Sequence, residues 1–499
     1  MISFRQTVLA ATALFSSQLF ASPWIDANEL FLRNHIQQLA DAGVLSAPVT
    51  TYPLMWNAIS ADLLNASPDK LSPRLQQSYA QVLHYFNRAQ RNQYNHQLKI
   101  SAANEAKRFN SFGDSQRQQA QLQLSTEYIG SFWAGKLSTQ LRVDAEDDNS
   151  LTFDNSYLAA TYGNWVVRFG AVSQWWGPGW DSSLIMSNNA RPLPALSLTR
   201  NNSNAFETPW LNWIGPWTFT AQMAKLESER HIPNAMLWST RATIRPISKL
   251  ELGLSWSIQW GGDGQPNSLK DFLDAVTSKQ ECANGADVCD PSLNTKLGNQ
   301  LAGFDIRWSD SIAGVPFSVY AQTIGEDAVN NIKPADKAYV FGIDSIFSIM
   351  EQPIRVFLEY TETEVACGKN PNSLNCYYEH TTYYTGYRYH QRAIGTTYDN
   401  DTIAWSLGFL GQFENGQQWR SILRIAQLNT DNIDRAPTSS MVGNQVSKIA
   451  EDLVQLELQY QWPMFSGLLT IGGDISHSSY IDKKSKNEGN ANVAWEYRY

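Results

Sequence analysis

The last nine residues of the chain alternate between apolar and polar positions. Ala491, Val493, Trp495, Tyr497 and Tyr499 share one parity, and the residues between them are mostly polar. Successive side chains of an extended strand point to opposite faces, so this segment predicts a strand with one aromatic face and one polar face. A single strand of this kind is typical of a sheet edge, and its meaning depends on whether the pattern recurs.

The same alternation recurs from about residue 96 onward. It is clearest at 250–260, where Leu and Trp alternate with Glu, Gly, Ser and Gln, and it is repeated at 122–128, 137–143 and 454–460. Weaker segments of the same kind lie near 217–225, 235–246, 301–308, 316–324, 354–361, 402–411, 417–428 and 467–476. Short strands with one apolar face, separated by turns, are typical of transmembrane barrels, and roughly 400 residues at about 22 per strand predict about 18 antiparallel strands. A soluble propeller would show an internal period of about 40–50 residues, and none is found.

Residues 24–91 follow a helical spacing instead. Three short amphipathic helices are predicted: one that ends at Gly43, one that begins at Pro53 and one that begins after Ser72. Their expected inward-facing residues are Leu32, Ile36, Leu39, Trp56, Ile59, Leu63, Leu75, Tyr79, Val82 and Phe86. These helices would form a small bundle ahead of the barrel.

The N-terminus has the features of an export signal. Arg5 is followed by an apolar stretch, and Ala21 provides a small residue before a cleavage site. We therefore expect a signal peptide at 1–21, a periplasmic helical bundle at 22–94 and an outer-membrane barrel at 95–499. Such barrels have short periplasmic turns and long outer loops. The long irregular segments expected outside or folded into the lumen are 173–215, 261–298, 363–378 and 429–449.

Composition and charge narrow the possible partners. The net charge is −9, and no basic stripe is present that would neutralise phosphates, so nucleic acid is not an expected partner. Charged residues make up only 17% of the chain, against about 25% in soluble domains. Outer-membrane lipid, lipopolysaccharide and, during insertion, the barrel-assembly machinery are the expected partners. Lys483, Lys484 and Lys486 are candidates for lipopolysaccharide phosphates, although such a group is usually just a hydrophilic loop.

The four cysteines form two local pairs, Cys282 with Cys289 and Cys367 with Cys376. Neither pair has zinc-site spacing, whereas an exported protein commonly closes such loops with disulfides. Local pairing also has the smallest loop-closure cost of the three possible connectivities. Residues 144–149, with four acidic side chains, could ligate calcium but are more typical of a solvated loop. No metal and no cofactor is predicted.

Residues 170–217 form the most unusual stretch, rich in Gly, Pro and Trp. Indole faces stack on the apolar faces of sugar rings, which makes this stretch a candidate polysaccharide site. The candidate residues are Trp175, Trp176, Trp180, Arg191 and Trp210. The alternative role, which is the more usual one, is that these tryptophans pack inside the barrel as a plug or lie in the interfacial girdle.

Several long strings in this chain resemble the capsule-assembly Wzi-type outer-membrane proteins. They are Gln174–Gly179 (QWWGPG), Gly215–Trp217 (GPW), Gln259–Pro266 (QWGGDGQP), Gly298–Asp305 (GNQLAGFD) and Gly325–Asp327 (GED). The resemblance covers nearly the whole mature chain. It implies an 18-stranded barrel with an N-terminal periplasmic helical bundle, a largely occluded lumen and a lectin-like role in attaching or organising capsular polysaccharide at the cell surface.

The functional prediction is a non-enzymatic barrel that binds capsular or extracellular polysaccharide through its outer loops. One alternative is a porin-like channel for small solutes or sugars, which requires an open lumen. The other is a membrane-embedded hydrolase, for which His380 and His390 would be candidate bases. No GxSxG nucleophile elbow is present, but residues far apart in the sequence could still assemble a site.

Overall fold

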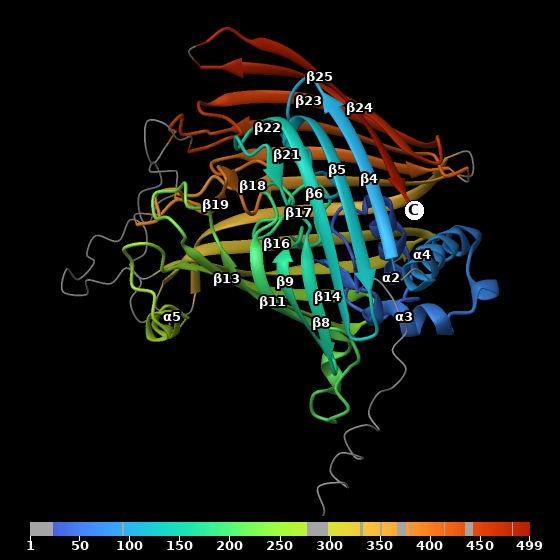
Figure 1. The fold of residues 1–499 in the computed structure, drawn as a ribbon. Coiled ribbons are helices and arrows are strands. Elements are labelled where there is room, and N and C mark those ends of the chain that lie inside the picture. Colours follow the sequence, from blue (N-terminus) through green and yellow to red (C-terminus); the bar gives the residue numbers. More distant parts are fainter. Residues whose placement is uncertain are drawn as a thin grey trace, which may run out of the picture.

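The structure of the protein, a computed structural model, describes residues 23–91, 94–276, 298–329, 333–349, 352–366, 376–380, 382–413, 415–434, 443–481 and 483–499. Within these ranges 18 antiparallel strand positions form a closed barrel (Figure 1). The first barrel strand, β4 (Tyr94–Ala103), pairs with the last, β25 (Lys486–Arg498), and closes the sheet. Closure leaves no unpaired strand edge. The predicted fold class is confirmed.

Strands that follow one another in the chain are neighbours in the barrel. One position is shared by β7 (Leu151–Thr152) and β8 (Tyr157–Tyr162), which both pair with β6 (Trp133–Ala145). The remaining barrel strands are β5 (Gln118–Ile129), β9 (Trp165–Ala171), β11 (Pro194–Arg200), β12 (Trp217–Lys225), β13 (Met236–Ile247), β14 (Leu250–Trp260), β15 (Gly298–Ile312), β16 (Val315–Val329), β17 (Lys333–Ile349), β18 (Gln352–Glu362), β21 (Ile403–Gln412), β22 (Gln418–Leu428), β23 (Glu451–Met464) and β24 (Gly467–Tyr480).

The alternation seen in the sequence places apolar residues outside and polar residues inside. In β6, Leu137 and Leu141 are 61% and 53% exposed, whereas Ser138 and Arg142 are only 0% and 5% exposed. This arrangement is the reverse of a soluble protein, in which apolar side chains are buried. It suits a barrel that has lipid around it and a polar interior. In the described part of the chain, no helix has the length and apolar character needed to cross a membrane.

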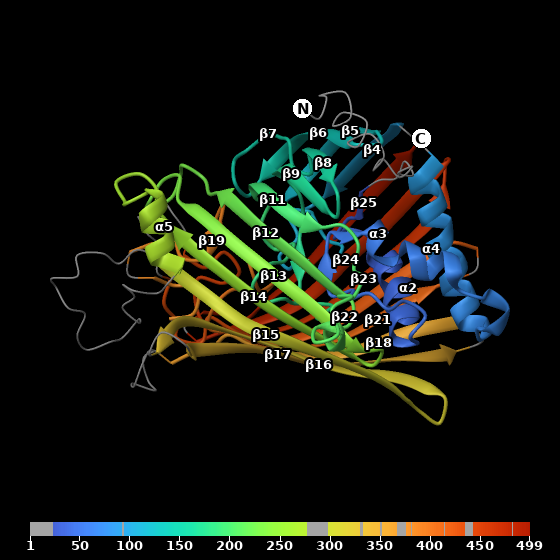
Figure 2. The same ribbon diagram turned by 90° about the horizontal axis from the view of Figure 1, so that it is seen from below.

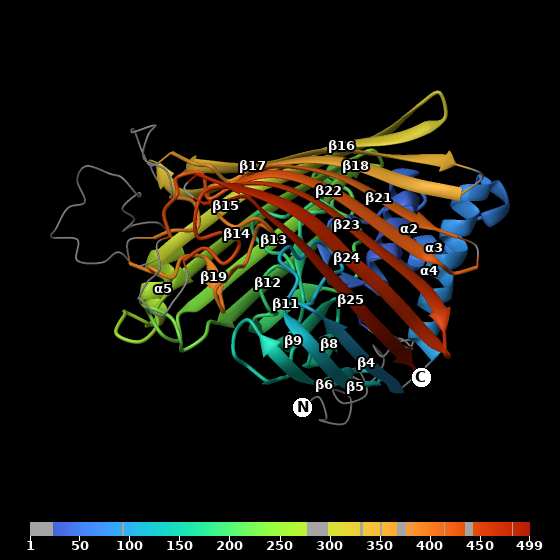
Figure 3. The ribbon, with the colours of Figure 1, turned by 90° about the horizontal axis from the view of Figure 1, so that it is seen from above.

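The three predicted helices are present. They are α2 (Leu30–Asp41), α3 (Trp56–Asn65) and α4 (Pro73–Arg91), and they lie at the end of the barrel where the C-terminus is found (Figures 2 and 3). The sequence pattern did not predict that the polar face of α2 is buried as well. Every residue of α2 from Leu30 to Ala40 is buried. Its polar face meets the inner wall instead of water.

Shorter elements complete the described structure. Two-residue strands join segments far apart in sequence: β1 (Trp24–Ile25) pairs with β3 (Leu54–Met55), and β2 (Thr51–Tyr52) pairs with β10 (Trp175–Trp176). The others are β19 (Arg388–Tyr389), β20 (Arg392–Ala393), the 3₁₀ helices η1 (Pro68–Lys70) and η2 (Asn212–Ile214), and helix α5 (Leu269–Val276). The strand β11 divides the segment 173–215, which was expected to be irregular throughout. The segment 261–298 likewise contains α5.

Candidate functional site

The two ends of the barrel differ in the length of their connections. At the end with α2–α4 and the C-terminus, here called the helix end, Ala313–Gly314 and Phe465–Ser466 join neighbouring strands by two residues. The opposite, loop end has much longer connections at 104–117, 172–193, 363–402 and 429–450. The loop 201–216 is a long connection at the helix end.

Connections from the loop end fold into the lumen. Two of them, 172–193 and the described residues of 376–402, are here called the plug, and Phe112 of the connection 104–117 is buried against them. Nearly every described plug residue is buried. The plug packs with α2 and the inner wall in two apolar clusters, one of which contains Ile36, Trp175, Trp180, Tyr320 and Phe357. The expectation that segments from this end fold into the lumen is confirmed for the plug.

Trp175 and Trp176 lie inside the barrel and have no exposed surface. Both belong to β10, which pairs with β2 from the N-terminal segment. The Nε1–H of Trp175 donates to the carbonyl oxygen of Gly179 at 3.1 Å. Their burial fits the packing role and leaves neither indole face open to a polymer outside the barrel.

Trp180, also buried, is the contact between the plug and α2. The guanidinium carbon of Arg33 lies 4.3 Å from the ring centroid of Trp180 and 4.3 Å from that of Phe112. Arg33 also donates to the carbonyl oxygens of Pro178 and Gly179 at 3.0 and 2.8 Å. Burial lowers the pKa of Arg33 to about 10, which leaves its side chain charged at neutral pH. A cation among aromatic faces thus joins the helices to the plug.

The carboxylate of Glu359, on β18, holds the turn after the QWWGPG string. It accepts main-chain N–H groups from Trp180, from Asp181 at 3.0 Å and from Ser182 at 3.3 Å. The glycines of the string allow close packing at this point. A Cβ on Gly179 would lie 2.2 Å from the carbonyl oxygen of Ser182, so no side chain fits there. The string therefore has a clear structural role in the plug.

Arg191, the fourth candidate, lies at the loop end and is only partly buried. It donates to both carboxylate oxygens of Asp154, at 2.9 and 2.8 Å, and to Asp147 at 2.7 Å. It lines a small cleft together with Arg117 and Arg392. Among the five sequence candidates, Arg191 is the one that lies at this cleft.

Trp210, the fifth candidate, lies away from the other four. It is 72% exposed and belongs to the loop 201–216 at the helix end, where Trp213 is 65% exposed. The expectation that all of 173–215 faces outward or folds into the lumen is wrong, because β11 carries the chain across the barrel to the helix end before Trp210 is reached. The pattern of β11 was hard to recognise, since only Leu196 and Leu198 form its apolar face.

Two of the weaker candidates form ion pairs within the protein. Asp147 pairs with Arg142 at 2.9 Å, and Lys486 pairs with Glu488. Among the described residues no group of three or more His, Cys, Asp or Glu side chains could hold a metal ion. Lys483 and Lys484 show no contact that decides their role. Cys376 is buried in the plug, whereas Cys282, Cys289 and Cys367 lie outside the described residues, so both disulfides stay predictions.

Sequence reasoning missed the charged interior. Eight arginines lie on the polar parity of the described barrel strands and are buried in the lumen: Arg142, Arg168, Arg241, Arg245, Arg307, Arg355, Arg420 and Arg424. Several pair with acids of the helices, the plug or the wall, such as Arg307 with Asp41 at 2.9 Å and Arg241 with Asp305 at 2.6 Å. The recurrence of arginine at inward positions was the available signal for a packed, charged lumen.

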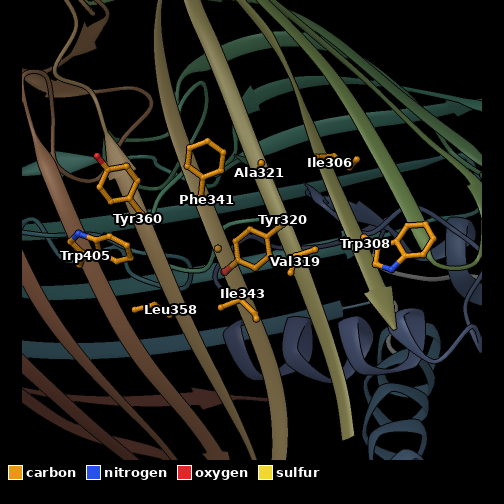
Figure 4. Close-up of a pocket in the computed structure, with 11 residues that line it drawn as sticks. Ile306, Trp308, Val319, Tyr320, Ala321, Phe341, Ile343, Leu358, Tyr360 and Trp405 are labelled. Atoms are coloured by element: carbon orange, nitrogen blue, oxygen red, sulfur yellow. The ribbon is translucent and has the colours of Figure 1, made fainter. Parts of the chain in front are cut away.

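A hollow of about 640 Å³ lies on the outer wall over β15–β18 and β21 (Figure 4). Its lining includes Trp308, Ala321, Phe341, Tyr360 and Trp405. Because most of its lining comes from the outward, apolar parity of the strands, it faces lipid. We therefore do not place a polysaccharide site there.

Comparisons with known proteins agree with this architecture. The family model described as capsule assembly protein Wzi matches residues 89–493. A solved structure of Wzi from Escherichia coli, described as a carbohydrate-binding β-barrel involved in group 1 capsule assembly, is 26% identical, with a TM-score of 0.79 over 95% of this chain and 99% of that chain. A protein encoded in the cps region of Klebsiella pneumoniae is 29% identical over 365 residues, which cover 71% of this chain and 68% of that protein. OprD of Pseudomonas aeruginosa is far less similar, at 8% identity and a TM-score of 0.45 over 82% of this chain and 94% of that chain.

The match to the family model spans more than three quarters of the chain. Together with the closed barrel and its apolar outer face, it shows that the chain is an outer-membrane protein of the capsule assembly protein Wzi family.

Proposed function

We propose that this protein binds capsular or extracellular polysaccharide at the cell surface and helps to attach and organise it there. The observation that carries the proposal is the full-length similarity to the E. coli barrel, which is described as binding carbohydrate. Each sugar contact would be weak, and many copies of the protein on one polymer would retain it through avidity. This role requires an accessible outer face. It does not require an open channel through the lumen.

The orientation is part of the proposal. Short turns at the helix end and long connections at the loop end match the periplasmic and outer sides of such barrels. We place the helical segment 22–94 in the periplasm and the loop end outside, with residues 1–21 as a cleaved signal. Arg191 is then a candidate polysaccharide contact, while Trp175, Trp176 and Trp180 stabilise the plug. Trp210 faces the periplasm in this orientation.

The occupied lumen argues against the channel alternative. The α2 helix enters from one end and the plug from the other, and they meet at Arg33 and Trp180. Ion pairs fix this filling to the wall, including Arg424 with Asp181 at 2.7 Å, where neither side chain is exposed. Planar-bilayer recordings of the purified protein should show little or no ion conductance.

A purely binding role also fits the surroundings of the two histidines. In His380, Nδ1 accepts the main-chain N–H groups of Thr382 and Tyr383, at 3.1 and 3.2 Å, and thereby holds a turn of the plug. His390 lies at the tip of the β19–β20 hairpin with a φ of +46°. We infer that neither acts as a catalytic base. Alanine variants of both should leave lipid and glycan turnover unchanged.

Deleting the protein tests the proposal in cells. Cell-bound and released polysaccharide are measured together with the uptake of a small sugar, in the deletion strain and in the same strain complemented with the wild-type chain. We expect the bound fraction to fall, the released fraction to rise and uptake to stay unchanged. An unchanged bound fraction with reduced uptake would favour the channel instead.

A further inference from the structure

Four arginines converge on the cleft at the loop end. Arg117 comes from the segment before β5, Arg142 from β6, Arg191 from the plug and Arg392 from β20. The barrel wall is lowest beside the cleft, because β8, β9 and β11 have only six or seven residues. The cleft therefore brings together cations from distant parts of the chain at the end that we place outside the cell.

The cleft has an excess of positive charge. Four guanidinium groups meet three carboxylates here, since Glu146 and Asp147 line the cleft and Asp154 binds Arg191, which leaves one positive charge in excess. The remaining lining residues are Tyr389 and His390, and burial keeps the pKa of His390 below its ordinary value, so the imidazole adds no charge at neutral pH. The whole chain carries −9, so this excess is a local feature and does not follow from composition.

Two of the arginines are held in fixed directions. Arg392 binds both carboxylate oxygens of Glu146 at 2.6 Å, and Arg191 binds both oxygens of Asp154. Such two-pronged pairs hold the planar guanidinium groups in one orientation. A ligand would therefore meet cations that are already ordered and would lose little further entropy in ordering them.

Arg117 differs from these two arginines. In the described part of the chain its hydrogen bonds go to main-chain carbonyl oxygens, at 3.1 Å for Ser115, 3.0 Å for Asn189 and 2.9 Å for Ala190, with a further bond to Asn188. Burial, reinforced by the charge of Arg392, lowers the pKa of Arg117 to about 9. Carbonyl dipoles satisfy its donors but do not cancel its charge, so an arriving anion would be stabilised here.

The size of the cleft limits what can enter. The space inside the cleft is about 10 Å³, close to the volume that one water-sized group needs. A carboxylate oxygen fits this space and a sugar ring does not. The ring of an acidic sugar would remain outside with its carboxylate directed inward.

We propose that this cleft binds the carboxylate of an acidic sugar, such as a uronate, in the polysaccharide that the protein retains. The proposal rests on the proposed function and assigns its ligand a chemical class. Arg117 supplies the uncompensated charge, because its hydrogen bonds go to carbonyl oxygens, and the ligand's carboxylate displaces water from the cleft. The protein should therefore bind acidic polysaccharides more tightly than neutral ones.

Reducing the polymer's carboxyl groups tests the proposal. Surface polysaccharide from the producing strain is compared with the same polymer after its carboxyl groups have been reduced to hydroxymethyl groups. Binding is measured with purified protein in detergent free of lipopolysaccharide. We expect the native polymer to bind at least about tenfold more tightly. Equal binding of both forms, or a native polymer without acidic groups, would overturn the proposal while the proposed function stands. Absence of binding to either form would contradict both.

A matched pair of variants tests whether the polymer's carboxylates bind in this cleft. His390→Asp places a carboxylate in the cleft, and Asn432→Asp places one elsewhere at the loop end. Both positions have left-handed backbones, with φ of +46° and +60°, where Asp is tolerated. Retention of the folded barrel is checked for both by its shift in electrophoretic mobility on heating.

We expect His390→Asp to weaken binding of the native polymer about tenfold and to leave binding of the reduced polymer unchanged. Asn432→Asp should bind the native polymer as tightly as the wild type does. Equal behaviour of the two variants would overturn the proposal. Titration with lipopolysaccharide tests whether the cleft binds the phosphate groups of this lipid instead of the carboxylates of the polymer. If His390→Asp weakens lipopolysaccharide binding but not polymer binding, the cleft is a lipid headgroup site and the proposal is wrong.

Discussion

The guanidinium carbon of Arg33 lies 4.3 Å from the ring centroid of Trp180, and this contact joins the two parts that fill the barrel. Arg33 belongs to α2, and Trp180 belongs to the plug that enters from the other end. Arg33 also holds two carbonyl oxygens of the QWWGPG string. A side chain of the N-terminal helices therefore connects the two parts that fill the lumen.

Replacing Arg33 should loosen the plug without unfolding the barrel. Arg33→Ala removes the aromatic contacts and two charged hydrogen bonds, a loss on the order of 3 kcal/mol for plug docking. The expected result is measurable ion conductance and faster proteolysis within 172–193, with heat-modifiable mobility retained. Arg88→Ala, at an exposed position of α4, is the control and should behave like the wild type. A closed Arg33→Ala protein would show that the contact is dispensable.

Acid should weaken the attachment of the helices through His35. Its Nδ1 lies 3.1 Å from the Ser78 hydroxyl of α4, and its Nε2 lies 2.5 Å from the Gln412 side-chain oxygen of β21. Burial lowers the pKa of His35 to about 4, although the bond to Gln412 opposes this shift. The folded state thus disfavours the proton, so stability is full above pH 6.5 and is lost as the pH falls toward 4. The shift from 6.5 to about 4 corresponds to roughly 3 kcal/mol.

Hydrogen exchange of α2 and α4 at pH 7 and pH 4.5 measures this loss. We expect exchange of both helices to increase at pH 4.5 in the wild type and to increase much less in His35→Gln, which cannot take up the proton. Carboxylates titrate in both proteins, so their contribution cancels in the comparison. The same pH response in both proteins would rule out His35 as its source.

The ion pair between Arg424 and Asp181 should behave as a buried, coupled unit. Both side chains have no exposed surface, and their atoms are 2.7 Å apart. Arg424→Met leaves Asp181 without its principal counter-charge and should cost about 3–5 kcal/mol, and Arg424→Met with Asp181→Asn should cost less than the sum of the single changes. Thermal unfolding in detergent, followed by loss of the heat-modifiable band, measures the differences. Additive effects would contradict the coupling.

A surface ion pair provides the comparison. Lys249 and Asp310 are 2.7 Å apart at the helix end, but their side chains are 49% and 32% exposed. Solvent weakens such pairs, so Lys249→Met should change stability by no more than about 1 kcal/mol. A similar cost for Lys249→Met and Arg424→Met would mean that burial does not set the strength of these pairs.

The barrel wall could be predicted from the sequence because the polarity of each residue indicates whether its side chain faces lipid or the lumen. Leu137 and Ser138 differ in polarity because one meets lipid and the other the lumen, and the same rule holds along most of the described length of the long strands. The start of α4 followed an equally local signal, Pro73 at its first position, whereas the predicted start at Pro53 is wrong, because Leu54–Met55 form β3 and α3 begins at Trp56. The strand β11 was missed because two leucines are too few to show a period.

The roles of the tryptophans could not be predicted in this way. Trp180 has the same local sequence context whether it stacks on a sugar or on Arg33, and Arg33 lies 147 positions earlier in the chain. The cleft is non-local for the same reason: its arginines come from four segments that only the closed barrel brings together. Gly- and Pro-rich strings indicated an unusual structure but did not distinguish a plug from a binding surface.

Epitope tags test which end faces outward. A short tag inserted after Thr208, in the loop with Trp210, should be recognised by antibody only after the outer membrane is permeabilised. The same tag after Asn432, at the loop end, should be recognised on intact cells. The reverse result would invert the orientation, and it would restore Trp210 as a candidate contact with surface polysaccharide.

Direct binding of polysaccharide to the purified protein tests the central claim. The folded wild-type protein, in detergent and free of lipopolysaccharide, is titrated with surface polysaccharide from the producing strain, with heat-unfolded protein as the control. We expect saturable binding that requires the folded barrel and that coexists with negligible conductance in planar bilayers. A folded protein that binds no polymer but conducts ions steadily would contradict it.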